Sequence, residues 1–339
     1  MRILLVKTSS LGDVVHNLPV ASDLRARFPQ ARIDWVVEEG FADIPRLHPA
    51  VRKVIPVAVR RWRRALLSAA TWGELRAYRA AVRAERYDLV LDTQGLVKSA
   101  LLARQADGKR AGYAAEAVRE PLAARFYDAT YAIPKNLHAV ERNRWLAAAA
   151  LGYELTLPLD YGIAAAPLAA PWLPAAPYCV LLTASSRVDK LWPEADWLAL
   201  AAALNARGLA CVLPGGSAEE RARATRLAGG MAQAVAAPPM GIAELAQLLA
   251  GARLVVGVDT GLSHIAAALG RLTFCLFAGS HPELTGVHAG DTAINLGGAG
   301  APPTAAQVIE AVEDHVGRAS ARQQQSNNRP SRPEGRPTE

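Results

Sequence analysis

Short apolar segments alternate with longer helical patterns from one end of this 339-residue chain to the other. In the first half we expect strands at 2–7, 32–38, 53–58 and 87–93, and helices at 17–28, 73–86, 96–105 and 138–151. The second half repeats the order, with strands at 178–183, 209–214, 253–259 and 273–278 and helices at 193–207, 217–229, 241–251 and 261–270. Such alternation predicts an α/β protein with parallel sheets covered by helices.

A proline-rich segment divides this alternation into two halves. Chains beyond about 250–300 residues usually split into domains, so this length favours two. Five prolines and little regular periodicity mark the segment LTLPLDYGIAAAPLAAPWLPAAP, which is typical of a linker. We expect a Rossmann-like domain at 1–155, a linker at 156–176, a second Rossmann-like domain at 177–317 that ends in a helix near 304–317, and a disordered tail at 318–339.

Composition narrows the class of protein and of partner. No apolar run reaches the roughly 18 residues that a membrane span needs, so we expect a soluble body. Cys179, Cys211 and Cys275 lie inside separate apolar segments, as expected for core thiols in a reducing cytoplasm. Much of the net charge of +7 comes from the segment VRKVIPVAVRRWRR, which has six basic residues and no acid. An anionic partner is expected there.

Polar residues in the segment KTSSLGDVVHN follow the first expected strand directly. Parallel sheets bind ligands beyond the carboxyl ends of their strands, so Lys7 and Asp13 are candidate site residues. Asp13 is either a general base for an acceptor hydroxyl or a cap for the helix ahead. The residues alone favour the cap, because aspartate is a frequent helix cap. Lys7 is likewise either a site residue or a structural one. His16 is expected to pack or to lie on a helix surface.

A second polar turn, in LLTASSRVDKLWPEADW, follows a strand of the second half. It holds Ser185, Ser186 and Lys190, whose hydroxyl and ammonium donors suit phosphate oxygens. A polar turn with a solvated lysine is an equal interpretation of the same residues.

The segment VVGVDTGLSHIAAALG runs from an expected strand straight into a helix. Free backbone N–H groups and the positive end of the helix dipole favour a phosphate above Gly261, and Thr260 and Gly261 allow it to approach closely. Alternatively, Asp259 or Thr260 is a simple helix cap and His264 a surface residue.

A third turn, LPGGSAEERA, starts another helix with Glu219 and Glu220. One of these acids is expected to stabilise the helix dipole, and the other to accept hydrogen bonds from ribose hydroxyls. Spacing does not decide which. Three strand ends that converge on one cleft fit a nucleotide site.

Several motifs are missing from the sequence. There is no G-x-x-x-x-G-K-[ST] loop and no G-x-G-x-x-G after the first strand, which weakens kinase, ATPase and dehydrogenase interpretations. There is also no D-x-D pair and no His/Cys cluster of metal-ligand spacing. We therefore expect neither a metal nor a cofactor.

Eight segments together resemble the ADP-heptose:lipopolysaccharide heptosyltransferases of glycosyltransferase family 9, over nearly the whole chain to about residue 316. They are VKTSSLGDVVHNLP, DWVVEEGF, VIPVAVRRWRR, DTQGLVKSALLAR, REPLAARFYD, HAVERNR, DKLWPEADW and VDTGLSHIAAALG.

The resemblance implies a GT-B fold, in which two Rossmann-like, doubly wound domains face a central cleft. The first domain would bind the acceptor and the second ADP-heptose. It implies transfer of L-glycero-D-manno-heptose to the first Kdo of Kdo2-lipid A, in lipopolysaccharide core synthesis on the cytoplasmic face of a Gram-negative inner membrane. The reaction would invert the anomeric centre without an obligatory metal, and Asp13 would be the general base.

The resemblance also assigns binding residues. Positions that match donor contacts are Ser185, Ser186, Lys190, Glu220, Met240, Asp259, Thr260, Gly261 and His264. Positions tied to the anionic acceptor are Lys7, Arg60, Arg61, Arg63, Arg64, Lys98, Arg119 and His138. The family often has threonines where this chain has Ser185 and Ser186, which keeps the hydroxyls. Val57, Val59 and Trp62 alternate with the arginines, which indicates a surface that touches lipid or sugar.

Two alternatives stay open. A nucleotide-sugar epimerase or hydrolase of similar fold has a small soluble substrate, which would not need the basic cluster. A non-catalytic binder of anionic glycolipid or nucleic acid is the other; little aromatic interleaving beyond Trp62 argues against nucleic acid.

Overall fold

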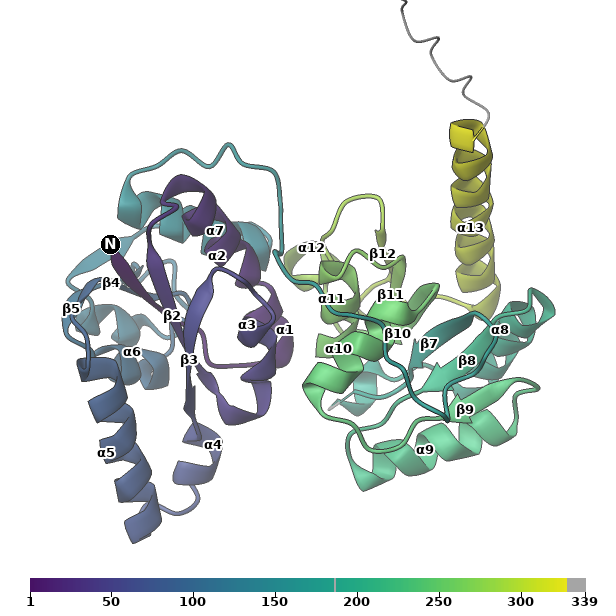
Figure 1. Cartoon of the computed structure of the whole chain (residues 1–339), viewed down its shortest axis with the longest axis horizontal. Helices are drawn as coiled ribbons and strands as arrows, with labels where there is room; N and C mark the ends of the chain where they lie inside the picture. Colours follow the sequence, from purple (N-terminus) through teal and green to yellow (C-terminus); the bar gives the residue numbers. More distant parts are fainter. Residues whose placement is uncertain (186, 328–339) are drawn as a thin grey trace, which may run out of the picture.

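The computed structural model describes residues 1–185 and 187–327 and contains two α/β domains (Figure 1). Each has a parallel sheet of six strands with helices packed around it. The first sheet has the order β3-β2-β1-β4-β5-β6, and its strands are β1 (Arg2–Val6), β2 (Arg32–Glu38), β3 (Val51–Val57), β4 (Tyr87–Asp92), β5 (Gly108–Tyr113) and β6 (Ala129–Tyr131). Its helices are α1 (Leu11–Val15), α2 (Leu18–Arg27), α3 (Asp43–Arg46), α4 (Val59–Trp62), α5 (Ala69–Arg83), α6 (Val97–Ala103) and α7 (Ala139–Leu151).

The second sheet has the order β12-β11-β10-β7-β8-β9. Its strands are β7 (Tyr178–Leu182), β8 (Ala210–Leu213), β9 (Ala234–Ala236), β10 (Leu254–Val258), β11 (Thr273–Phe277) and β12 (Ala293–Gly297). Its helices are α8 (Glu194–Ala206), α9 (Ala218–Gly229), α10 (Ile242–Gly251), α11 (Gly261–Ala268), α12 (Pro282–Thr285) and α13 (Ala305–Asn327).

Both sheets have the same topology. Numbered within its own domain, each runs 3-2-1-4-5-6, the order of dinucleotide-binding folds. The order reverses between β1 and β4 in the first sheet and between β7 and β10 in the second, and both pairs are parallel. Ligands bind in the crevice outside such a reversal point. The topology therefore places the loops after these four strands where site residues are expected.

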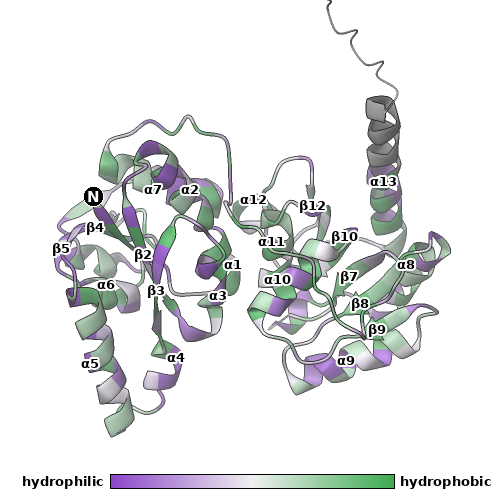
Figure 2. Cartoon of the chain, viewed as in Figure 1, coloured by the Kyte–Doolittle hydropathy of each residue, from purple (hydrophilic) through white to green (hydrophobic). Residues whose placement is uncertain are grey.

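Burial on both faces explains why most strands were recognisable. Every residue of β7, β10 and β11 is buried, and these strands are predominantly hydrophobic, whereas α9 on the outside is hydrophilic (Figure 2). All eight expected strands are confirmed within one or two residues. The sequence analysis missed β5, β6, β9 and β12. β6 and β9 are only three residues long, β5 (GKRAGY) carries charged residues and glycines, and β12 (AINLG) is only partly buried.

Three helix boundaries differ clearly from expectation. The helix expected at 73–86 is α5, which begins four residues earlier and ends three residues earlier. Residues 11–15 form a separate short helix, α1, so Asp13 lies inside a helix rather than ahead of one. The last helix does not end at 317 but continues to Asn327, which corrects the expected start of a disordered tail at 318. Alanine, arginine and glutamine after 317 favour helix, and the next proline is Pro330. Residues 328–339 of that expected tail lie outside the described part of the chain.

Residues 152–177, where the linker is expected, contain no helix or strand but are anchored at both ends. On the first-domain side Arg144 Nη2 donates to the Leu157 carbonyl at 2.8 Å. On the second-domain side Leu168 N donates to the Gln247 carbonyl at 3.1 Å. Between them, the Tyr161 hydroxyl donates to the His288 carbonyl at 2.7 Å.

The two domains share one apolar core. A single cluster joins Val14, Val15 and Ile44 of the first domain to Leu248 and Ile265 of the second. At its centre α1 packs against α11, with a glycine of each helix against a side chain of the other. A Cβ on Gly261 would lie 2.6 Å from Leu11 Cβ, and one on Gly12 would lie 3.0 Å from His264 Cδ2. Glycine at both positions therefore allows this close approach.

The buried ion pair between Arg144 on α7 and Asp23 on α2 should be a main support of the first domain. Arg144 Nε and Nη2 donate to the carboxylate at 2.8 and 3.0 Å, and the side chains are 4% and 2% exposed. Arg144→Met should lower the free energy of unfolding by about 3–5 kcal/mol, because it leaves a buried charge unpaired. Urea denaturation measures this. Arg46→Met, which removes an exposed pair with Asp43, should change it by less than about 1 kcal/mol. Equal effects of the two substitutions would contradict the assignment.

Candidate active site

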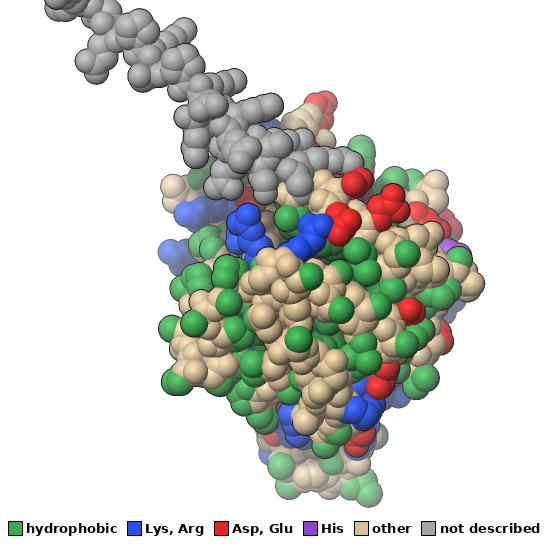
Figure 3. Space-filling model, turned by 90° about the vertical axis from the view of Figure 1, so that its right-hand side faces the viewer, with side chains coloured by type: hydrophobic (Ala, Val, Ile, Leu, Met, Phe, Trp, Pro, Cys, Tyr) green, Lys and Arg blue, Asp and Glu red, His purple; other side chains and the backbone are tan. Residues whose placement is uncertain are grey.

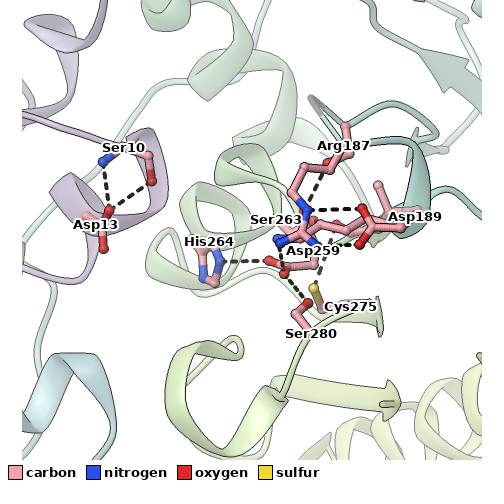
Figure 4. Close-up of polar contacts among 12 residues, drawn as sticks. Ser10, Asp13, Arg187, Asp189, Asp259, Ser263, His264, Cys275 and Ser280 are labelled. Carbon is pink, nitrogen blue, oxygen red and sulfur yellow. Dashed lines mark hydrogen bonds and ion pairs between the residues drawn. The ribbon is translucent and has the colours of Figure 1, made fainter. Parts of the chain in front are cut away.

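Asp259 is the centre of a polar cluster in the second domain (Figure 4). It follows β10 directly, and its Oδ2 accepts hydrogen bonds from Lys190 Nζ at 2.6 Å and from Ser280 Oγ at 2.5 Å. His264 Nε2, in the first turn of α11, lies 3.8 Å from Asp259 Oδ1. Ser185 Oγ is 3.5 Å from the Asp259 carbonyl oxygen, the limit of a hydrogen bond. The structure thus brings together four of the residues singled out from the sequence.

The charges of this cluster are stabilised mutually. Burial alone would raise the pKa of Asp259, but the contacts from His264, Lys190 and Ser280 outweigh burial and hold that pKa well below its usual value. Asp259 is therefore an anion at neutral pH. It holds the Lys190 ammonium, whose side chain is 18% exposed, beside the start of α11.

The first turn of α11 has no side-chain cap, and Thr260 precedes it with extended backbone. Its backbone N–H groups and the helix dipole therefore favour a phosphate. Gly261, expected to give space for a phosphate, also gives space for Leu11 of the other domain.

The remaining donor candidates lie in other loops. Glu220 Oε2 accepts hydrogen bonds from the Gly216 and Ser217 backbone N–H groups at 2.8 and 3.1 Å, so this acid caps α9. Glu219 accepts from Ser217 Oγ at 2.7 Å, also at this end of α9. Met240 precedes α10 and is partly buried against the shared core. Ser186 lies outside the described residues.

On the first domain, Asp13 is the third residue of α1. Its Oδ2 accepts hydrogen bonds from Ser10 N at 2.7 Å and Ser10 Oγ at 2.9 Å (Figure 4). Asp13 thus stabilises the start of its own helix from the third position, whereas the residues predicted a cap of the helix ahead. Oδ1 has no hydrogen-bond partner among residues 1–185 and 187–327. One carboxylate oxygen orients the side chain and the other is left for chemistry.

Asp13 lines a cavity of about 190 Å³ between the domains. Its walls carry three cationic side chains, and one wall residue, Thr285, comes from the second domain. The lining residues are Lys7, Asp13, Thr93, Gln94, Leu96, Tyr113, Val118, Arg119, Ala139, Arg142, Asn143 and Thr285. Such a lining suits an anionic, hydroxyl-bearing molecule.

The loops after β1 and β4 are tied together behind this cavity. Gln94 Oε1 accepts hydrogen bonds from Thr8 N and Ser9 N at 2.9 and 3.1 Å. Lys7 Nζ donates to the Thr93 carbonyl at 2.8 Å and to Asn143 Oδ1 at 3.3 Å. Burial lowers the pKa of Lys7, and the nearby Asp13 carboxylate partly offsets this. Lys7 thus supports the loop that carries Asp13 while adding positive charge beside it.

The basic segment is only partly available to a ligand. Arg61 is paired with Glu39 and Glu74, and the Arg60 guanidinium lies 5.2 Å from the centre of the Phe41 ring. Arg63 and Arg64 are exposed and have no ion-pair partner in the described part of the chain. Lys98 Nζ donates to Ser9 Oγ at 2.9 Å. Burial lowers the pKa of Lys98, and Arg60 and Arg63 lower it further.

The apolar residues between these arginines do not form the surface expected from the sequence. Val57 and Trp62 are 1% and 6% exposed, and Val59 packs partly buried against the same small core. The Trp62 indole donates to Glu74 Oε2 at 2.6 Å. These three side chains face inward because β3 and α4 need them to close the outer face of the sheet.

Four histidines meet where the domains touch. His16 Nε2 lies 3.1 Å from His264 Nδ1, and His138 Nε2 lies 3.1 Å from the Gly286 carbonyl oxygen. His138 Nδ1 accepts from Val140 N, so its proton is on Nε2 and is donated across the interface. His138 stacks on His288 with ring centres 4.6 Å apart. In this structure His138, expected at the acceptor, joins the two domains.

Comparison with known proteins identifies the family. The model of glycosyltransferase family 9 (heptosyltransferase) matches residues 75–316. The chain is 49% identical over 300 residues to lipopolysaccharide heptosyltransferase 1 of Pseudomonas aeruginosa, covering 88% of this chain and 84% of that one. It is 49% identical over 288 residues to the Salmonella typhimurium protein of the same name, covering 84% and 91%. The chain belongs to glycosyltransferase family 9.

Solved structures agree with this membership. The E. coli heptosyltransferase WaaC with ADP superposes with a TM-score of 0.85 at 43% identity, covering 94% of this chain and 99% of that one. E. coli ADP-heptose lps heptosyltransferase II, at 22% identity, shares the fold with a TM-score of 0.75, covering 94% and 100%. The GT-B arrangement expected from the sequence is thereby confirmed.

Sequence reasoning missed several residues of this candidate site. Arg142 and Asn143 line the cavity one turn into α7, within the segment HAVERNR. Their helical spacing from His138 was the signal that could have found them. Ser280 follows β11, the neighbour of β10, so the rule about strand ends would have found it. Thr285 and the contact between His16 and His264 depend on domain packing, for which the sequence has no local signal.

The interface histidines should make stability depend on pH. Burial lowers the pKa of His16 and brings that of His138 to about 4, whereas an unfolded histidine has a pKa near 6.5. Between these values the unfolded chain binds more protons. The free energy of unfolding should therefore fall as pH drops from 6.5 to 4, by up to about 1.4 kcal/mol per unit for each histidine.

Denaturation at a series of pH values measures that slope. His138→Asn should reduce it, because asparagine keeps an acceptor for the α7 cap but does not titrate. His281→Asn, on an exposed residue, is the control. An unchanged slope in His138→Asn would show that this histidine does not contribute.

Proposed function

We propose that this protein transfers L-glycero-D-manno-heptose from ADP-heptose to the first Kdo of Kdo2-lipid A. One observation carries the proposal. The helix that bears Asp13 packs directly on α11, whose uncapped first turn stands beside Lys190 and Asp259. The helix that carries the Asp13 carboxylate thus packs against the helix whose start would bind the phosphates of the donor.

The donor would occupy the second domain. The E. coli relative WaaC was solved with ADP and with ADP-2-deoxy-2-fluoro heptose. In this chain, Lys190 and the first turn of α11 would bind the diphosphate, with Ser185 as a hydroxyl donor. Glu220 and Met240 would contact the nucleoside. The other donor residues proposed from the sequence, Ser186, Asp259, Thr260, Gly261 and His264, would contact the donor as well.

The acceptor would enter the cavity lined by Lys7, Arg119 and Arg142, where cations match the carboxylates of Kdo. Arg60, Arg63 and Arg64 would meet phosphate groups at its outer edge, and Arg61 would do so only by leaving its two glutamates. Within the described residues no helix is long and apolar enough to cross a membrane. We therefore propose peripheral attachment to the cytoplasmic face of the inner membrane.

The chemistry follows from these positions. Asp13 Oδ1 accepts the proton of a Kdo hydroxyl while that oxygen forms a bond to the anomeric carbon of heptose. The bond from this carbon to the diphosphate oxygen breaks on the opposite face, and its electron pair leaves with ADP. Attack from opposite the leaving group inverts the anomeric centre. Lys190 and the α11 amides stabilise the charge that develops on the diphosphate. No step in this scheme requires a metal.

Asp13→Asn tests the base. The amide oxygen still accepts from Ser10, so the fold of α1 should persist, but the side chain no longer takes a proton. Transfer to Kdo2-lipid A should fall about 10²–10⁴-fold, while ADP affinity by calorimetry stays within about twofold. Ser10→Ala, which keeps the carboxylate, should lose much less. Normal transfer by Asp13→Asn would contradict the assignment of Asp13 as the general base.

Lys190→Gln tests the leaving-group contact. We expect kcat to fall about 10²–10³-fold, because the ammonium that meets the developing charge is gone. Steady-state kinetics with ADP-heptose measures kcat and KM separately. A change in KM alone would mean that Lys190 binds the donor without stabilising the transition state. Arg187→Gln, in the same loop, is the control.

A further inference from the structure

Three large apolar side chains are exposed together between α4 and α5. Leu66 is 57% exposed, Leu67 101% and Trp72 56%. Residues 63–72, here called the α4–α5 tip, project beyond the body of the first domain (Figure 1). Single exposed apolar residues are ordinary, but three within seven positions at a protruding point mark an interaction site.

Hydrogen bonds hold the tip in a defined conformation. The Trp72 indole donates to the Leu66 carbonyl at 2.8 Å, which closes the turn across its base. Below it, Glu74 accepts from the Trp62 indole at 2.6 Å and from Arg61 Nη1 at 2.8 Å. These bonds fix α4 against α5 and hold Leu66 and Leu67 outward.

The charge around the tip is positive. Arg63, Arg64, Arg76 and Arg79 are exposed, and none has an ion-pair partner among residues 1–185 and 187–327. The nearby acid, Glu74, is already paired with Arg61. Leucine and tryptophan at the apex with unpaired arginines behind them are the composition of segments that enter the surface of an anionic bilayer.

Elsewhere in the described part of the chain, the exposed large apolar side chains are at least ten positions apart in the sequence. On the end of the molecule formed by the second domain, basic and acidic side chains lie close together and apolar side chains are scattered between them (Figure 3). On the first domain, Leu101 is 45% exposed on α6 without exposed large apolar neighbours in sequence.

We propose that the α4–α5 tip inserts Leu66, Leu67 and Trp72 into the headgroup boundary of an anionic phospholipid bilayer. Arg76 and Arg79, behind the apex, contact lipid phosphates, each adding about fivefold to the partition constant. This inference rests on the proposed function, since an acceptor anchored in the membrane requires the enzyme to work there. The occupant is the bilayer itself, not the acceptor.

Further basic side chains lie between the tip and the loop that carries Asp13. Besides burial, Arg60 and Arg63 lower the pKa of Lys98, and Lys98 Nζ donates to Ser9 Oγ, one residue before the start of α1 at its N-cap, Ser10.

Vesicle co-sedimentation of the full chain tests the proposal without acceptor present. Vesicles of phosphatidylethanolamine with phosphatidylglycerol should bind the protein, and vesicles of phosphatidylcholine alone should not. Leu66→Ser with Leu67→Ser should weaken binding at least tenfold, as should Trp72→Ser, while Leu101→Ser leaves it unchanged. Brominated lipids should quench fluorescence of the unsubstituted protein more than that of Trp72→Phe.

Two controls separate this inference from the proposed function. Asp13→Asn should bind vesicles normally, and the Leu66→Ser/Leu67→Ser variant should transfer normally to a deacylated acceptor. Circular dichroism checks that each variant folds. Equal vesicle binding by the tip variants and the unsubstituted protein, or binding only when acceptor lipid is added, would overturn the proposal. Failure of transfer in every assay with normal vesicle binding would instead overturn the proposed function alone.

Discussion

The close approach of α1 and α11 is the contact on which the rest of the site depends. Two glycines remove the side chains that would hold these helices apart, and the bond between His16 and His264 closes the gap. Both helices belong to loops at the points where the strand order reverses. Each sheet has a crevice at its reversal point, and the contact between α1 and α11 therefore brings the two crevices together.

Charge is arranged differently on the two sides of this contact. On the second domain, Asp259 keeps Lys190 in place, so the cation is oriented before any ligand arrives. On the first domain, Ser10 fixes Asp13 through one oxygen while cations line the neighbouring cavity. Each charged group is thus held by a neighbour rather than by solvent, and little reorganisation is needed when substrates bind.

Much of the fold and part of the site could be predicted from the sequence. Buried parallel strands appear as continuous apolar runs, so β1, β7 and β10 could be predicted. β6 and β9 are three residues each, which is too short for a recognisable periodicity. Lys190 and Asp259 were found because both follow strands of one sheet. Contacts between domains, such as that of His16 with a residue 248 positions away, have no local pattern. The inward direction of Trp62 was missed because its partner, Glu74, lies on the next helix.

The anchored linker restricts how the domains can separate. Gly162, with φ of +65°, sits against His48 of the first domain, and Pro167 already touches the second domain near Gly251. Ile163 is buried in the shared core, so the three alanines at 164–166 are the place for a hinge. Opening there must break three hydrogen bonds together, those of Tyr161 with His288, His138 with Gly286 and His16 with His264. Separation of the two domains at this pivot is therefore a cooperative step.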